Sequence, residues 1–124
     1  MTLLNTQPTA NGRMSKWVTH DGQTQTLGAL QPGSYFVRAH CHVTESFDSD
    51  GSDTLTVGYD TDTDAFVTSI DVSSTGVKSV TLGTLQGYNG TARSVKAYYV
   101  AGGSAPTQGK AIVIVEFLPV PVSP

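Results

Sequence analysis

A chain of 124 residues is long enough to bury one hydrophobic core and too short for two, so we expect a single domain. Seven Lys and Arg residues against ten Asp and Glu residues give a net charge of -3, which argues against a nucleic-acid partner. Thr (17) and Val (14) are abundant whereas Glu (2) and Lys (4) are scarce, so strand formers outnumber helix formers.

The N-terminal residues 1–13 contain Pro8 and Gly12 without a sustained hydrophobic period, which predicts an extended arm. Residues 1–5 lack the basic and apolar regions of a secretory signal, and the longest apolar run, 111–115, is too short to span a bilayer. We therefore expect a protein that is made in a cytoplasm and has no membrane partner.

Between the two ends of the chain, apolar and polar residues alternate with a period of two, which is typical of strands with one buried face. In the longest such segment, 35–47, the even positions from Arg38 to Ser46 are polar. The odd positions apart from Glu45 are apolar and form the expected buried face: Tyr35, Val37, Ala39, Cys41, Val43 and Phe47. No segment shows a helical period. The expected strands are residues 15–19, 24–30, 35–47, 55–59, 66–72, 78–85, 95–99 and 111–117.

A short internal repeat suggests how these strands are arranged. Thr-Leu-Gly-Ala-Leu-Gln at 26–31 recurs as Thr-Leu-Gly-Thr-Leu-Gln at 81–86, which is the pattern of two related halves that each present one apolar sheet face. We predict an all-β, jelly-roll-like sandwich of about eight antiparallel strands. The expected division is an N-terminal arm at 1–13, a single domain at 14–118 and a Pro-rich C-terminal tail at 119–124.

Seven of the ten carboxylates fall between residues 45 and 64, a span without Lys or Arg. Segments 48–53 and 60–64 offer oxygen ligands that suit calcium, but neither has the spacing of an EF-hand loop. Asp, Ser and Gly are also the residues that tight turns between strands require. We therefore predict turns without a bound metal, and a calcium site is the alternative.

His40, Cys41 and His42 resemble a metal motif, but successive residues of a strand point to opposite faces. Cys41 would face the core and the two histidines would face outward, so a shared zinc ion would need a third ligand such as Glu45. Surface histidines are the commoner arrangement, and we predict no metal and no cofactor. Because Cys41 is the only cysteine, an intrachain disulfide is excluded.

The sequence contains no arrangement that we interpret as catalytic. It has no Gly-x-Ser-x-Gly elbow and no phosphate-binding loop before a helix. The Gly-rich segment 102–109 is interpreted as a strand connection, and Asn89-Gly as a hairpin turn. We therefore expect a protein that is not an enzyme.

Ile112 and Ile114 lie on the polar phase of the last expected strand, which makes this strand apolar on both faces. An exposed apolar face of this kind needs a cover. We predict that both residues belong to a subunit interface. The alternative is that the N-terminal arm folds back over them through Leu3 and Leu4, which would give a monomer.

Five segments carry a resemblance to a known family: LGALQPGSYFV at 27–37, VTESF at 43–47, SDTLTVG at 52–58, DVSSTG at 71–76 and GKAIVIVEF at 109–117. They are similar to segments of the small jelly-roll structural proteins of tailed bacteriophages. That family includes the capsid decoration, or cement, proteins and related head or fibre components. The resemblance covers about residues 24–118.

The resemblance implies a virion protein that is synthesised in the host cytoplasm and sits on the capsid exterior as a homotrimer. Its partner would be the major capsid protein of a phage head, which it would stabilise. One alternative is a carbohydrate-binding module, or a fibre or receptor-binding component, with Trp17, Tyr88 or Tyr98 stacking on sugars and the acidic loops holding calcium. Another is a cupin-type enzyme with His40 and His42 as metal ligands.

Overall fold

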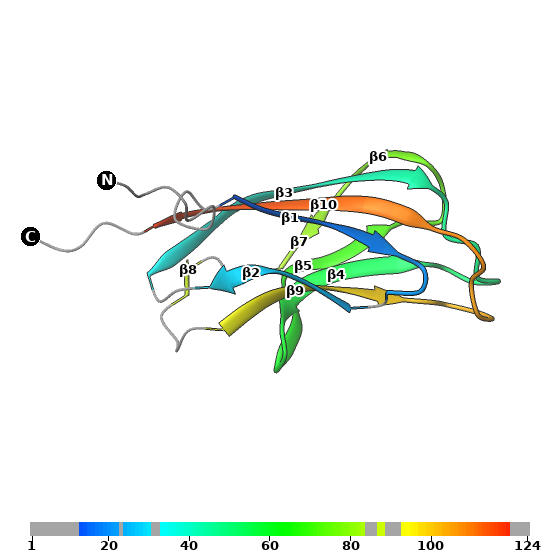
Figure 1. Cartoon of the computed structure of the whole chain (residues 1–124). Coiled ribbons are helices and arrows are strands. Elements are labelled where there is room, and N and C mark those ends of the chain that lie inside the picture. Colours follow the sequence, from blue (N-terminus) through cyan, green and yellow to red (C-terminus); the bar gives the residue numbers. More distant parts are fainter. Residues whose placement is uncertain (1–12, 23, 31–32, 84–86, 89–92, 120–124) are drawn as a thin grey trace, which may run out of the picture.

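The computed structural model describes residues 13–22, 24–30, 33–83, 87–88 and 93–119, which form ten strands and no helix. The strands make two antiparallel sheets that pack face to face (Figure 1). Sheet A contains, in spatial order, β1 (Arg13–Thr19), β10 (Lys110–Pro119), β3 (Ser34–Glu45) and β6 (Gly76–Lys78), and β8 (Gly87–Tyr88) also pairs with β3. Sheet B contains β2 (Thr24–Leu30), β9 (Arg93–Val100), β4 (Thr54–Tyr59), β5 (Asp62–Asp71) and β7 (Thr81–Leu82).

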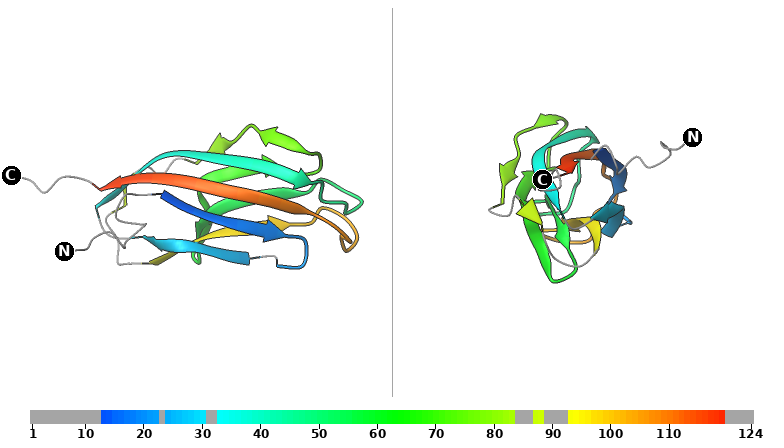
Figure 2. Two further views of the ribbon diagram at one scale, coloured as in Figure 1. Left: turned by 45° about the horizontal axis from the view of Figure 1, so that its top comes forward. Right: turned by 90° about the vertical axis from the view of Figure 1, so that its left-hand side faces the viewer.

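The strand order is that of a jelly roll. The chain passes back and forth between the sheets, so that β1, β10, β3 and β6 are neighbours in one sheet and β2, β9, β4 and β5 in the other. The two short strands β7 and β8 add to these eight. The prediction of an all-β jelly-roll sandwich is confirmed, and the end-on view in Figure 2 shows the two sheets enclosing the core. No helix in the described part of the chain is long and apolar enough to cross a membrane.

The internal repeat does not correspond to the two sheets. Each sheet combines strands from both halves of the chain, because the jelly-roll connections cross between the sheets. Residues 26–30 of the first copy fall in β2, at one edge of sheet B, and residue 31 lies outside the described residues. The second copy begins in β7, at the other edge of the same sheet, and continues into residues 84–86, which lie outside the described residues. The expectation that each half presents one sheet face is therefore wrong.

Aromatic side chains from both sheets meet in the core. Phe66 of sheet B is fully buried, and its ring centroid lies 5.4 Å from that of Phe36 and 5.1 Å from that of Phe117, both of sheet A. Phe47 and Tyr99 form a second pair, with centroids 4.7 Å apart. Such tilted and edge-on pairs add specific contacts to the burial of apolar area. The rings thus fix how the two sheets are stacked.

The alternation predicted for 35–47 changes phase inside β3. Glu116 pairs with Arg38, but the next residue of β10, Phe117, pairs with Phe36, so one residue of β3 is left over as a bulge. As a result Phe36 is buried and Tyr35 is 43% exposed. The expectation that Tyr35 faces the core is therefore wrong, because an inserted residue reverses every side chain beyond it.

The strand predicted at 78–85 is divided between the two sheets. β6 ends at Lys78 and pairs with β3 in sheet A, whereas β7 begins at Thr81 and pairs with β5 in sheet B. The chain crosses from one sheet to the other between these residues, so the backbone changes hydrogen-bonding partner there. A single strand at this place is a wrong prediction.

Candidate interaction surface

The outer face of sheet A carries a row of side chains that crosses four strands. Trp17 of β1 pairs with Ile112 of β10, and His42 of β3 pairs with both Ile112 and Val77 of β6. We call these four residues the cross-strand row. Val77 is 81% exposed and Trp17 is 49% exposed, whereas Ile112 is half-buried between its neighbours. Exposed apolar side chains on one face of a sheet, here Trp17 and Val77 at the two ends of the row, are typical of a protein contact surface.

The next two rows of the same face contain Ile114 and a charged cluster. Ile114 is half-buried beside Ser15 and His40. The predicted interface residues, Ile112 and Ile114, therefore lie next to one another on an outward face, as the alternation indicated. The alternative cover for these two residues is the N-terminal arm with Leu3 and Leu4, and residues 1–12 lie outside the described residues.

Glu116 is the centre of the charged cluster, which we define as Arg13, Arg38, His40 and Glu116. Its carboxylate lies 2.9 Å from the Nε of Arg38, 3.4 Å from an Nη of Arg13 and 3.7 Å from the Nε2 of His40. Two guanidinium groups share one carboxylate, so the cluster keeps a positive charge even when His40 is neutral. The arginine side chains are 70% and 62% exposed and can reach a partner.

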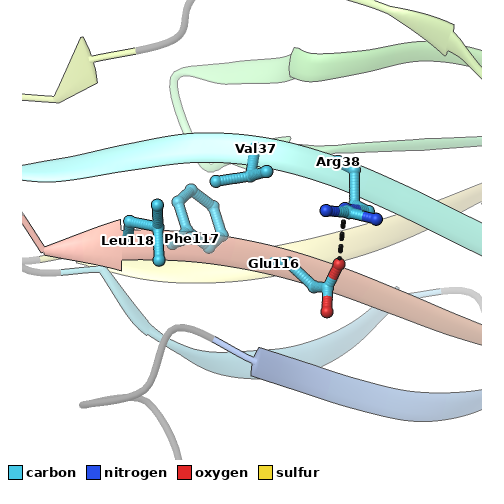
Figure 3. A pocket seen from close by; sticks show the side chains of 5 residues that line it. All are labelled: Val37, Arg38, Glu116, Phe117 and Leu118. Atoms are coloured by element: carbon cyan, nitrogen blue, oxygen red, sulfur yellow. Dashed lines mark ion pairs between the residues drawn. The ribbon is translucent and has the colours of Figure 1, made fainter.

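A small depression opens beside the Arg38–Glu116 ion pair, between β3 and β10 (Figure 3). Its volume is about 150 Å³, and Val37, Phe117 and Leu118 complete its lining. Sites for small-molecule ligands are usually larger, roughly 300–1,000 Å³. The depression therefore fits one side chain of a protein partner better than a cofactor.

The two histidines and the cysteine of β3 point as the alternation predicted. Cys41 is buried, and burial raises the pKa of its thiol to about 11, while His40 and His42 are exposed on the outer face. The carboxylate beside His40 is Glu116, which the arginines already engage. Across the described residues, no group of three or more His, Cys, Asp or Glu side chains is placed to hold a metal.

The acidic segment 48–53 links two loops at one end of the sandwich. Asp48 accepts hydrogen bonds from the backbone N–H of Thr107 at 2.6 Å, from the Thr107 hydroxyl at 2.5 Å and from the backbone N–H of Gln108 at 3.1 Å. These bonds lower the pKa of Asp48. Asp50 accepts one from the Ser104 hydroxyl at 3.0 Å, and Glu45 accepts one from the backbone N–H of Gly109 at 3.1 Å. The carboxylates thus serve the loops as hydrogen-bond acceptors.

Asp53 is the buried polar group that the sequence analysis did not single out. It is 0% exposed, and its Oδ1 accepts hydrogen bonds from Ser49 Oγ at 2.5 Å and from Tyr99 Oη at 2.6 Å. Its Oδ2 has no partner among the described residues. Desolvation and the bond to Asp53 raise the pKa of Tyr99. The alternation of the sequence could have predicted this burial, because Asp53 is two residues before Leu55 and four before Val57, and both of these face the core.

The aromatic residues considered for sugar stacking do not share a face. Trp17 lies on the outer face of sheet A, whereas Tyr98 lies on sheet B with its hydroxyl buried and unpartnered within the described part of the chain. The side chain of Tyr88 and the Asn89 turn lie outside the described residues. The described residues therefore contain no paired aromatic platform of the kind that a flat glycan site requires.

This chain is similar to known proteins in its fold and not in its sequence. No protein-family model matches the sequence, and no curated protein matches it. A chain of the cyanophage Pam1 capsid asymmetric unit superposes with a TM-score of 0.64 at 14% identity, over 88% of this chain and 84% of that one. The chain shares its fold with components of phage capsids. A second such structure, the acidic stable capsid of Helicobacter pylori bacteriophage KHP30, matches with a TM-score of 0.60 at 15% identity, over 85% of this chain and 84% of that one.

Proposed function

We propose that this protein is a non-enzymatic structural component of a phage virion, a decoration or cement protein that binds the outside of the head and stabilises it. The observation that carries the proposal is the fold shared with chains of two phage capsid structures. The shared region makes up most of both chains in each comparison, so the similar chains are also small. A single small jelly roll is suited to attachment on a shell.

The surface of sheet A supports the same proposal. A protein that assembles as a homotrimer needs an exposed contact face between copies, and the cross-strand row with its neighbour Ile114 supplies an apolar one flanked by arginines. Arg and Trp are the residue types that most often anchor protein interfaces. The partner that the proposal names is the major capsid protein, with further contacts between copies of this chain in a homotrimer.

Co-sedimentation with phage heads that lack the protein tests the attachment. We expect the purified chain to pellet with such heads and to saturate at a fixed ratio to the capsid subunits. Heads that already carry the protein are the control and should bind little more. Binding that never saturates, or equal binding to both kinds of head, would contradict specific attachment.

The subunit contact predicts a second result. Changing Ile112 and Ile114 together to Thr keeps strand propensity but removes apolar contact area. The two half-buried side chains should contribute at least about 2 kcal/mol on full burial, so the dissociation constant of the trimer should rise by roughly 30-fold or more. Sedimentation velocity at micromolar concentrations measures it.

Val100→Thr is the matched control, because Val100 is 52% exposed on sheet B and lies away from the proposed contact. It should associate like the unmodified protein. An unmodified chain that sediments as a monomer, or a double variant that remains fully associated, would refute the role of Ile112 and Ile114.

A further inference from the structure

Positive charge is concentrated on the outer face of sheet A. Arg13, Arg38 and Lys110 stand on this face with two acidic neighbours, Glu116 and the Glu45 that pairs with Lys110, which gives a net charge of about +1 with the histidines neutral. The whole chain has a net charge of -3. The rest of the molecule is therefore strongly negative, and the outer face of sheet A is complementary to it.

The β4–β5 hairpin carries the opposite charge on a projecting element. Figure 1 and Figure 2 show this hairpin extending away from the two sheets. Asp60 in its turn and Asp62 and Asp64 at the start of β5 lie within five residues, and Arg93 pairs with Asp60 at 2.9 Å. Among the described residues, Arg13, Arg38 and the four lysines form no ion pair with Asp62 or Asp64. Desolvation and the neighbouring Asp64 raise the pKa of Asp62.

The hairpin cannot neutralise the charged cluster of its own chain. It extends from sheet B, and sheet A faces outward on the other side of the core. Two packed sheets are about 10 Å apart, so the body of the sandwich separates the two surfaces. Contact between them requires a second copy. A contact between two different surfaces of identical chains builds a ring when the rotation between neighbours closes.

We infer that the β4–β5 hairpin of one copy docks on the outer face of sheet A of the next copy, with Asp62 and Asp64 opposite Arg13 and Arg38. This inference rests on the proposed function, because it names the surface that covers Ile112 and Ile114 in the oligomer. The Thr61 and Thr63 methyl groups of the hairpin would cover part of the cross-strand row. Charge complementarity fixes the pairing of surfaces, since a second sheet A face would bring the arginines of two copies together.

Charge inversion tests the pairing. In the hairpin variant, Asp62→Lys and Asp64→Lys reverse the exposed acidic pair. In the cluster variant, Arg13→Glu, Arg38→Glu and Glu116→Lys together preserve the local ion pairs while they change the charge of the cluster from positive to negative. A combined variant carries all five substitutions in one chain. Ala105→Lys, in the exposed β9–β10 loop, controls for added charge.

We expect each partial variant to weaken self-association at least about 100-fold in sedimentation velocity, because like charges are then juxtaposed. The combined variant should self-associate with a dissociation constant within about threefold of that of the unmodified protein. The Ala105→Lys control should have the same dissociation constant as the unmodified protein. Association of the unmodified protein should also weaken from 0.05 to 0.5 M NaCl, as expected for exposed charges. Circular dichroism confirms that each variant is folded.

A combined variant that stays monomeric, or partial variants that associate normally, would overturn the inference. So would a cluster variant that loses binding to heads but still self-associates, because the face would then belong to the capsid. A monomeric unmodified chain that still saturates heads lacking it would overturn this inference and leave the proposed attachment standing.

Discussion

Replacing Phe66 with Ala should lower the free energy of unfolding by about 3–5 kcal/mol, the range for removing a large aromatic side chain from a core. Phe66 is 0% exposed and packs against Phe36, Phe117 and Tyr59, so no neighbour can fill the space without moving away from its own contacts. The loss is a large part of the 5–15 kcal/mol typical of a domain. Urea unfolding followed by circular dichroism measures it, provided that the slope with denaturant is unchanged.

Val100→Ala is the matched control for this prediction. Val100 is an apolar strand residue that is 52% exposed and lies away from the proposed subunit contact, so its truncation should change the free energy of unfolding by no more than about 0.5 kcal/mol. If Phe66→Ala and Val100→Ala cost the same, the assignment of Phe66 to the centre of the core is incorrect.

Replacing Tyr99 with Phe should destabilise the fold by about 2–3 kcal/mol, although only one oxygen atom is removed. The Tyr99 hydroxyl donates to the fully buried carboxylate of Asp53 at 2.6 Å, and without it only Ser49 satisfies that oxygen. A buried acceptor that loses its donor costs more than an ordinary hydrogen bond contributes. Thermal or urea unfolding of the variant gives the change in free energy.

The neighbouring residue provides the control. The hydroxyl of Tyr98 is buried without a hydrogen-bond partner in the described residues, so Tyr98→Phe should be neutral or slightly stabilising. A Tyr99→Phe cost below about 0.5 kcal/mol, or a larger cost for Tyr98→Phe, would show that the Asp53 hydrogen bonds do not stabilise the fold.

Alternation with a period of two was enough to predict most of the fold. It located the long strands, and it placed Cys41 in the core and His40 and His42 outside, because side-chain direction follows directly from the backbone period. The same parity would have placed Asp53 inside with Leu55. The composition of segment 48–53 predicts a turn instead, so composition and phase give opposite answers for Asp53.

Features that depend on pairing between distant strands could not be predicted. The bulge that buries Phe36 exists only because Phe117 of β10 pairs with it, 81 residues away in the chain. The cross-strand row depends on register in the same way. Trp17 and Val77 lie in one row because Ile112 and His42 pair with each other between them. Local patterns indicate which face a residue occupies, but not which residues of other strands lie beside it.

The stability of phage heads with and without this protein tests the proposed function most directly. Heads that lack it should release their DNA at a lower temperature than complete heads, and adding the purified protein should restore the higher value. Fluorescence of a DNA-binding dye during heating measures the release. Release at the same temperature with and without bound protein would contradict the role as a stabilising decoration protein.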